Sequence, residues 1–509
     1  MRPNILLITT DQQRRDCYGF RDRGVHTPHL DGLARRGTDF RNCITPSPVC
    51  QPARAAILTG LLPFTNGAAD NGIDLDPKIA EAGFAGHLSR AGYQTALVGK
   101  AHFSTKATFA PTGRAECAAS SADFPSDWNG PYMGFDHVEL ALFGKWFPER
   151  PPLRPPQGQH FESWFFETVG GESGYRQWAE KTKPATGAHQ TWSSALPVAW
   201  HPTTWVGDRS VEFLRNRNLN APFLLWASFG DPHHPFDCPE PWASLHDAAE
   251  VELPMHRELD LERRPWWHRA ALEGDPKLDD PVLKRFRKSG TRVLFQTDEQ
   301  LREMTANYYG MISLVDHNVG RLLAALADTG DLEDTYVFFT SDHGDFLGDH
   351  GLYLKGPMLY ESLINVGLIA AGPGVPEGRQ ASNVVSSLDL AATFAEIAGS
   401  PPPDSWHGTS LLDEGRNGRL SHAFCEWRVG ESRCGVPLRL TCVHDGTCKL
   451  TYEEESSTGE LYDLETDPHE MDDLWNTPEG RHAQDRLMEL IMTRIEQTPR
   501  AFAAPVGMT

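Results

Sequence analysis

The sequence is short of positive charge. Its 509 residues include 47 Lys and Arg against 69 Asp and Glu, which gives a formal net charge of −22. Proteins that bind nucleic acid hold the phosphate backbone with clustered Lys and Arg, so this balance argues against a general nucleic-acid binder. An anionic substrate would need a local cluster of cations to overcome the field of the whole molecule.

Cysteine and long apolar runs are also scarce. The nine cysteines are odd in number and scattered, so they do not form the pattern of a disulfide framework. The N-terminal stretch MRPNILLITTDQQ turns polar after a short apolar run. That run is too short for a signal-peptide core or a membrane span. We therefore expect a cytoplasmic protein that does not associate with membranes.

The rest of the chain alternates between strand and helix patterns. Continuous apolar runs typical of buried parallel strands occupy residues 4–10, 93–100, 221–230, 335–344 and 365–374. Helices are predicted over 27–37, 54–60 and 80–92. Apolar side chains recur at helical spacing over 300–328, which indicates one long helix or two helices broken near Gly310. This order of elements predicts an α/β sandwich with a largely parallel sheet.

Two long stretches and the C-terminal part depart from this alternation. Residues 104–200 and 231–298 are rich in Pro, Gly and Trp. We interpret them as structureless insertions that serve as functional covers or as binding loops. Short alternating segments after residue 400 turn at Asp445-Gly446 and end in a helix over 481–497, which predicts an antiparallel meander. The predicted domains are therefore a large α/β domain, 1–400, and a small α+β domain, 401–509. The final PRAFAAPVGMT could reach a neighbouring subunit.

Polar side chains follow two of the predicted strands directly. Asp11 and Gln12 follow the first strand, and Asp342 and His343 follow the strand that ends near residue 340. In open α/β sheets, ligands bind beyond the carboxyl ends of the strands. Carboxylate and amide oxygens suit hard divalent cations such as calcium, magnesium or manganese, and an imidazole leans toward manganese. Any one Asp could simply cap the next helix, but the two pairs together predict a metal site.

The stretch SPVCQPARAAILTG places Cys50 at the start of a predicted helix. Backbone N–H groups and the helix dipole lower a thiol pKa there and favour bound anions. Arg54 would share a helix face with Cys50 and offer its fork to a tetrahedral oxyanion. Lys100, His102 and His233 follow other strands to the same edge. Singly, these residues have ordinary structural interpretations, such as a buried thiol or a solvated strand-end charge; together they predict a catalytic anion site.

These residues belong to motifs that resemble a known family. CQPAR fits the Cys-x-Pro-Ser/Ala-Arg signature of type I, formylglycine-dependent sulfatases, and GYQTALVGKAHF (92–103) resembles their second signature. TPHLDGLARRGTDF, SFGDPHHPF, TSDHGDFLGDHG and GELYDLETDPHE resemble further blocks in the right order. The chain is similar to bacterial arylsulfatases and phosphonate monoester hydrolases in this alkaline phosphatase-like superfamily. The resemblance implies an α/β/α sandwich with a large mixed, mostly parallel sheet and a C-terminal domain with a four-stranded antiparallel sheet.

The resemblance also implies a mechanism. Cys50 would be oxidised after translation, by a formylglycine-generating enzyme, to formylglycine (3-oxoalanine), whose aldehyde hydrates to a diol. One hydroxyl, activated by a metal, attacks sulfur and displaces the alcohol, and the other then expels sulfate and regenerates the aldehyde. Asp11, Gln12, Asp342 and His343 would ligate the metal together with the diol oxygen derived from Cys50.

The remaining roles follow from the same resemblance. Arg54 would orient the formylglycine hydroxyl. Lys100 and Lys355 would bind the substrate and neutralise the sulfuryl oxygens as charge builds on them. His102 would act as the base for the second hydroxyl, and His233 would bind the substrate and protonate or hydrogen-bond the leaving oxygen.

Some positions depart from the commonest family pattern. Many sulfatases have Asp where Gln12 stands and Asn where His343 stands; the set found here resembles that of phosphonate monoester hydrolases, choline sulfatases and some bacterial arylsulfatases. It is less negative, so we expect Ca²⁺ with Mn²⁺ as the alternative. Lys100 and His102 are both present, whereas the phosphonate enzymes tend to replace them. Asn71 lies where relatives place an amide that contacts substrate.

We therefore expect hydrolysis of sulfate esters of aryl or other small alcohols. We also expect a small-molecule substrate and a homo-oligomer, either a dimer or a tetramer. A phosphonate monoester or phosphodiester hydrolase with the same machinery is the alternative, since both groups are tetrahedral and displaced in line. A non-catalytic anion- or glycan-binding relative is the third interpretation. Tryptophans in the insertions could stack on an aromatic or sugar group or cover the core; these are Trp128, Trp146, Trp164, Trp178 and Trp192.

Overall fold

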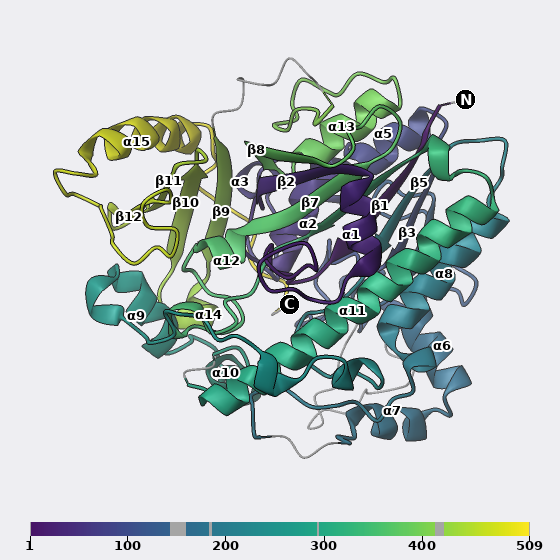
Figure 1. Cartoon of the computed structure of the whole chain (residues 1–509), viewed down its shortest axis with the longest axis horizontal. Coiled ribbons are helices and arrows are strands. Elements are labelled where there is room, and N and C mark those ends of the chain that lie inside the picture. Colours follow the sequence, from purple (N-terminus) through teal and green to yellow (C-terminus); the bar gives the residue numbers. More distant parts are fainter. Residues whose placement is uncertain (1, 143–158, 183–185, 293–294, 413–421, 508–509) are drawn as a thin grey trace.

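An eight-stranded mixed sheet forms the centre of the molecule (Figure 1). The computed structural model describes residues 2–142, 159–182, 186–292, 295–412 and 422–507. The strand order is β4-β3-β5-β1-β6-β7-β2-β8. In chain order the strands are β1 (Asn4–Thr10), β2 (Gly37–Ile44), β3 (Gln94–Gly99), β4 (His137–Leu140), β5 (Phe223–Ser228), β6 (Thr335–Ser341), β7 (Asn365–Ala371) and β8 (Arg379–Ser386). Only β7 runs antiparallel to its neighbours, so the sheet is mostly parallel, as predicted.

The central strands are mostly apolar because helices cover both faces of the sheet. Every residue of β1 is buried. Leu6 and Ile8 pack toward α1 (Pro28–Arg35), α8 (Pro202–Asn216) and α11 (Asp298–Asp328). Ile5 and Leu7 pack toward the opposite layer, which comprises α2 (Cys50–Thr59), α5 (Phe84–Arg90) and α13 (Asp389–Ile397). The two helical layers visible in Figure 1 confirm the α/β/α sandwich.

Two glycines explain where helices continue and where they stop. Residues 298–328 form one helix of 31 residues, so the alternative with a break near Gly310 is wrong. A Cβ at Gly310 would lie 2.5 Å from the carbonyl oxygen of Trp242, so glycine is needed for a loop to approach the intact helix. The helix predicted over 80–92 is two helices, α4 (Pro77–Glu81) and α5. Between them Gly83 lies against the Leu58 carbonyl, where a Cβ would come within 2.4 Å.

The two insertions are not structureless, contrary to expectation. The first contributes the edge strand β4 and the helices α6 (His160–Thr168) and α7 (Glu172–Ala179). The second contributes α9 (Trp266–Glu273) and α10 (Pro281–Ser289). These elements are short, and the surrounding Pro and Gly hid their periodicity. Residues 143–158, with PERPPLRPP and Trp146, lie outside the described part of the chain.

The C-terminal part forms a separate antiparallel sheet of four strands in the order β12-β11-β10-β9. Its strands are β9 (Ala423–Val429), β10 (Leu438–His444), β11 (Cys448–Glu453) and β12 (Thr458–Asp463), and α15 (Arg481–Glu496) packs on it. Short helices complete the fold: α3 (Pro63–Asn66), α12 (Glu361–Ile364) and α14 (Glu431–Cys434). Trp427 of β9 shares a buried cluster with Ile44 and Val49 of the large sheet region. The division at residue 400 stays a prediction.

The described end of the chain folds back on its own molecule. The backbone N–H of Val506 donates to the Gly72 carbonyl (2.8 Å), and the N–H of Phe109 donates to the Val506 carbonyl (2.9 Å). The described part of this segment therefore packs on its own molecule, and the expected contact with a neighbouring subunit stays a prediction. Among the described helices, none is long and apolar enough to cross a membrane.

Candidate active site

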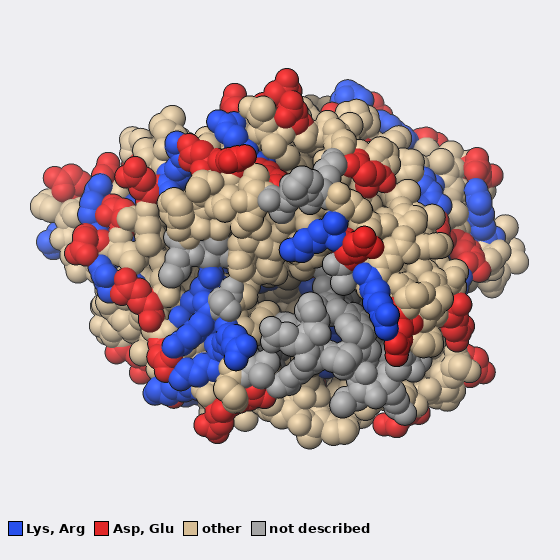
Figure 2. Space-filling model, turned by 90° about the horizontal axis from the view of Figure 1, so that it is seen from below, with Lys and Arg blue, Asp and Glu red and all other residues tan. Residues whose placement is uncertain are grey.

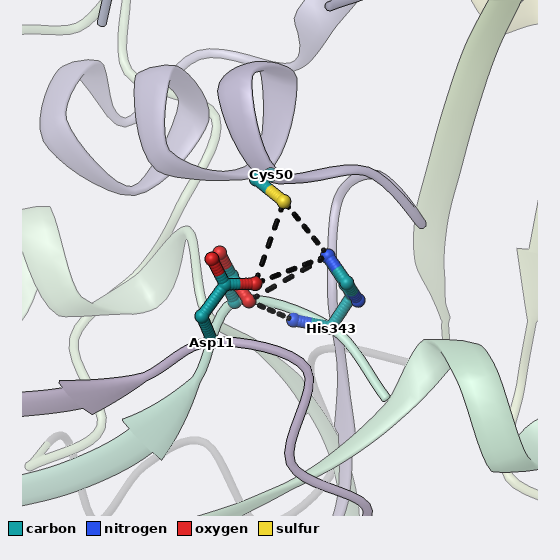
Figure 3. A group of neighbouring side chains, drawn as sticks. Asp11, Cys50 and His343 are labelled. Carbon is teal, nitrogen blue, oxygen red and sulfur yellow. Dashed lines mark hydrogen bonds and ion pairs between the residues drawn. The ribbon is translucent and has the colours of Figure 1, made fainter. Parts of the chain in front are cut away.

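Cys50 is the first residue of α2, and its thiol is almost completely buried. Figure 3 shows Sγ pointing from the start of the helix toward Asp11 and His343. Sγ lies 3.4 Å from Asp11 Oδ1, 3.2 Å from His343 Nε2 and 3.0 Å from Lys355 Nζ. Ligand atoms of Asp11, Cys50, Asp342 and His343 all lie within 4.8 Å of one another.

The topology of the sheet brings the two acidic residues together. β1 and β6 are parallel neighbours, so Asp11 and Asp342 leave the same edge of the sheet side by side. Oδ1 of Asp342 accepts from the backbone N–H groups of Gln12 (3.1 Å) and His343 (2.8 Å). Nδ1 of His343 donates to the Gly344 carbonyl (2.8 Å), so Nε2 faces the two carboxylates and would offer its lone pair to a bound metal ion.

Gln12 adds an unused acceptor to this cluster. Its backbone has a positive φ of 70°. Its Nε2 donates to the Asp345 carboxylate and lies 3.2 Å from His234 Nδ1. Oε1 is buried and has no hydrogen-bond partner among the residues that the structure describes. Two carboxylates, one imidazole lone pair and one unsatisfied amide oxygen fit a divalent cation.

Arg54 binds protein groups at the strand ends and, contrary to what its position on the helix had suggested, does not offer its fork to an oxyanion. Its Nε donates to Asp342 Oδ2 (2.8 Å), and its Nη1 donates to the Lys100 carbonyl (2.9 Å) and to Ser228 Oγ (2.7 Å). Most of the guanidinium therefore fixes the ends of β3, β5 and β6, and does not offer a fork to an oxyanion. Nη2, which is buried and lacks a partner in the described chain, is the donor left for a group at residue 50.

Lysines and histidines surround the thiol. Lys100 Nζ pairs with the Asp11 carboxylate, and Lys355 Nζ lies 3.1 Å from His233 Nε2. Burial alone would raise the pKa of Cys50, but Lys100, Lys355 and His343 outweigh it and hold that pKa well below its usual range. Negative charge at residue 50 is therefore stabilised.

The two remaining histidines are held neutral. Burial, followed by the charge of Lys100, lowers the pKa of His102 to about 4, and its ring is hydrogen-bonded to Cys50. Burial and the charge of Lys355 lower the pKa of His233. Nδ1 of His233 lies 2.5 Å from the His234 carbonyl, to which it donates, so Nε2 carries the lone pair and accepts from Lys355. Both histidines can therefore accept protons at the reaction centre.

A cavity of about 600 Å³ opens above Cys50. Asp11, Lys100, His102, His233 and Lys355 line its floor with Cys50, so the structure brings these predicted residues together. Gln12, Arg54, Asp342 and His343 lie behind them, as the contacts above show.

Asn71 and two of the tryptophans named from the sequence also line the cavity. Asn71 Oδ1 accepts from the Gln51 N–H (3.1 Å), which commits its acceptor to the first turn of α2. Trp178 and Trp192 lie in the cavity wall. Trp128 and Trp164 pack against other hydrophobic side chains at the edges of the two cores. Asn71 is therefore positioned to hold the helix that carries Cys50.

Sequence reasoning missed several residues of the site. Ser228 ends β5. Its Oγ donates to the Lys100 carbonyl (2.6 Å) and accepts a hydrogen bond from Arg54 Nη1 (2.7 Å). Its position at a strand end was a usable signal. Glu116 and Arg433 also line the cavity, but they come from an insertion and from the C-terminal region and carry no motif that points to the site.

A three-layer α/β/α sandwich with a buried carboxylate, imidazole and thiol cluster at the carboxyl edge of its sheet defines a hydrolase of the alkaline phosphatase-like class. The family model of sulfatases matches residues 3–400, and the model of the N-sulphoglucosamine sulphohydrolase C-terminal region matches residues 348–497. The chain belongs to the sulfatase family and is a sulfuric ester hydrolase.

Individual relatives agree with this assignment. An arylsulfatase of Clostridium perfringens is 28% identical over 97% of this chain and 95% of its own length. A choline-sulfatase of Rhizobium meliloti is 29% identical over 94% of this chain and 83% of its own. The solved phosphonate monoester hydrolase of Agrobacterium radiobacter is similar in structure, with a TM-score of 0.75 and 25% identity over 97% of this chain and 96% of that one. The sulfatase family implies a divalent metal and formylglycine.

Proposed function

We propose that the protein hydrolyses sulfate esters of small aryl alcohols with a formylglycine formed from Cys50 by a formylglycine-generating enzyme. The observation that carries the proposal is the position of Cys50: it begins the buried α2 within CQPAR, and its Sγ contacts an acid, an imidazole and a lysine of the predicted site. An unmodified thiolate at this point would repel a sulfate ester. A hydrated aldehyde would instead offer hydroxyl groups to the same partners.

Asp11, Gln12, Asp342 and His343 would hold the metal in this proposal. Three oxygen donors favour Ca²⁺, and the imidazole makes Mn²⁺ the alternative. When bound, the ion would act as a Lewis acid and lower the pKa of the nucleophilic hydroxyl.

The other residues bind and move protons. Lys100 and Lys355 would neutralise the sulfuryl oxygens in a largely buried, preorganised arrangement. His102 is neutral and hydrogen-bonded to residue 50, so it can take the proton of the second hydroxyl. A neutral His233 has no proton at Nε2 to give to the leaving oxygen. The site therefore favours alcohols that depart as stable anions, as phenols do.

Peptide mass spectrometry across Cys50, combined with kinetics on 4-nitrophenyl sulfate, tests the proposal. We expect kcat to rise in proportion to the fraction of aldehyde at residue 50. Cys50→Ala should lower kcat by at least about 10³-fold, since it removes the nucleophile. Cys43→Ala, at a buried cysteine of β2, is the matched control and should stay active. Full activity of protein that carries only the thiol at residue 50 would refute the mechanism.

Hydrolysis of phosphonate monoesters is the second candidate function. The similar structure of a phosphonate monoester hydrolase supports it. The presence of both Lys100 and His102 beside residue 50 favours sulfate instead, because the phosphonate enzymes of the family tend to replace this pair. One preparation should be measured on 4-nitrophenyl sulfate and on 4-nitrophenyl phenylphosphonate. We expect the larger kcat/KM on the sulfate, and the reverse order would make the phosphonate the principal substrate.

A further inference from the structure

The cavity above Cys50 carries cations that the reaction does not use. Besides Lys100 and Lys355, its wall includes Lys106, Arg287 and Arg433. Lys181 also lines it, with Nζ 4.6 Å from the centre of the Trp192 ring. On the face shown in Figure 2, Lys and Arg side chains gather around a hollow. In a chain with a net charge of −22, this is a local reversal of sign.

A chain of contacts connects Arg433 to the start of α2, the helix that carries Cys50. It belongs to α14, and its guanidinium lies 4.9 Å from the centre of the Trp427 ring. Its Nη2 is 3.5 Å from Asp70 Oδ1. Asp70 directly precedes Asn71, which holds the N–H of Gln51 at the start of α2. Arg433 therefore lies on the wall next to residue 50.

The contacts of Arg433 leave donor capacity for a ligand. Its Nε is buried and has no hydrogen-bond partner within the described residues. Asp70 Oδ1 already accepts from Trp427 Nε1 (2.9 Å) and from the Asn71 N–H (2.8 Å), so it is shared among three donors. A single, shared carboxylate oxygen at 3.5 Å does not use the bidentate fork of a guanidinium.

A second arginine stands near the first. Arg287 of α10 is only 4% exposed and lines the same cavity. Burial, followed by the positive charge of Arg433, lowers the pKa of Arg287 to about 9. Two like charges in a buried wall are unfavourable, and an anion bound between them would relieve the repulsion. Guanidinium groups match carboxylates and sulfates in shape and hydrogen-bonding geometry.

We infer that the alcohol half of the substrate carries a second anionic group, a carboxylate or a sulfate, which Arg433 and Arg287 bind while the ester reacts at residue 50. This inference rests on the proposed function. Lys106 and Lys181 also line this cavity and add to its positive potential. A monoanionic aryl sulfate offers no second anionic group to Arg433 and Arg287 and is a poorer substrate.

Three esters with similar leaving groups test the inference on the mature enzyme: 4-nitrophenyl sulfate and its 2-carboxy and 3-carboxy derivatives. We expect at least one carboxylated ester to have a kcat/KM at least about tenfold higher than the parent, mainly through KM. Arg433→Gln and Arg287→Gln should each lower the ratio of the carboxylated to the parent kcat/KM by about tenfold, which removes the preference and matches the loss of one charge-assisted hydrogen bond. Arg433→Lys should restore part of it, because the charge remains and the fork does not.

Lys288→Gln is the matched control. Lys288 lies next to Arg287 on α10, but it is half-exposed, pairs with Asp275 and does not line the cavity. Its replacement removes the same charge from the same helix and should leave the ratio unchanged. Turnover of the parent ester with no preference for either carboxylated ester would overturn the inference and leave the proposed function standing. A preference that depends on Lys181 and not on Arg433 would overturn the assigned position. No turnover of any ester by protein with the aldehyde would overturn the proposed function itself.

Discussion

A substitution at Gln12 can test metal binding with little change in side-chain size. Its Oε1 is buried without a partner in the described chain, and its backbone N–H donates to Asp342 Oδ1 of the acidic cluster. Gln12→Leu removes this oxygen and keeps the side-chain size. We expect it to weaken Ca²⁺ or Mn²⁺ affinity by about 10- to 100-fold, the range reported for perturbed metal shells. Calorimetric titration of the metal-free protein measures this directly.

The neighbouring Gln13 provides the control. Its Nε2 donates to the Cys17 carbonyl (3.3 Å), and its Oε1 is also buried without a described partner, but it does not contact the acidic cluster. Gln13→Leu should leave metal affinity unchanged. Equal affinities in the wild type and Gln12→Leu would remove Gln12 from the ligand set.

At this scale the sequence predicts which residues meet but not how they share hydrogen bonds. The motif CQPAR identified Cys50 and Arg54 together. It could not show that Arg54 spends three of its hydrogen bonds on Asp342, Ser228 and the Lys100 carbonyl. Those partners come from three other strand ends, and only the folded sheet places them around one guanidinium.

Among the elements, the loop after β3 depends on one buried carboxyl group. Glu116 accepts from the backbone N–H groups of Phe103 and Ser104 (both 3.1 Å) and from the Tyr132 hydroxyl (2.9 Å). It thereby fixes the loop that carries His102, whose φ is 56°. Burial raises the pKa of Glu116 to about 7.

This raised pKa makes the stability of the protein depend on pH. The folded state binds more protons than the unfolded state between about pH 4.5 and pH 7, so the contribution of Glu116 to stability falls as pH rises through that window. Glu116→Gln cannot titrate. Relative to this variant, the wild type should lose up to about 3 kcal/mol between the two pH values. Urea unfolding at a series of pH values measures the difference.

The exposed Glu172→Gln of α7 is the control, and it should show no such relative change. A difference between the wild type and Glu116→Gln that stays constant over the window would show that Glu116 does not titrate there.

Element by element, burial decided what the sequence could predict. The central strands β1, β5, β6 and β7 are almost completely buried and mostly apolar, so their runs were evident. β8 has exposed residues along its first half, and β4 has only four residues at the sheet edge. Such strands are held by pairing with a neighbour and not by their own pattern, so no local signal marked them.

For the whole molecule, the fold class followed from alternation and from the family motifs, but the contribution of the C-terminal region to the site did not. Arg433 enters the cavity wall because β9 and α14 pack against the large sheet region. That contact joins residues far apart in the chain. Composition and periodicity carry no information about such a pairing, and none of the motifs includes Arg433.

A buried ion pair ties the small sheet and its helix to the rest of the molecule. Arg494 of α15 donates through Nε to Glu426 Oε1 (2.6 Å) of β9 and through Nη2 to Thr65 Oγ1 (2.9 Å) of α3. Glu426 Oε2 accepts from the Phe64 N–H (2.8 Å). Both side chains of the pair are at most 4% exposed. Arg494→Met leaves the carboxylate buried and uncompensated, and should lower the free energy of unfolding by about 3–5 kcal/mol.

The second substitution decides whether charge or packing is responsible. Glu426→Gln keeps an acceptor for Phe64 and removes the charge, so Glu426→Gln combined with Arg494→Met should be more stable than Arg494→Met alone. Urea unfolding of the two single variants and the double variant closes the cycle. Additive losses would mean that the pair does not couple, and that shared apolar packing around Trp427 alone holds the small sheet in place. A favourable coupling would show that this ion pair fixes the side of the molecule from which Arg433 enters the cavity.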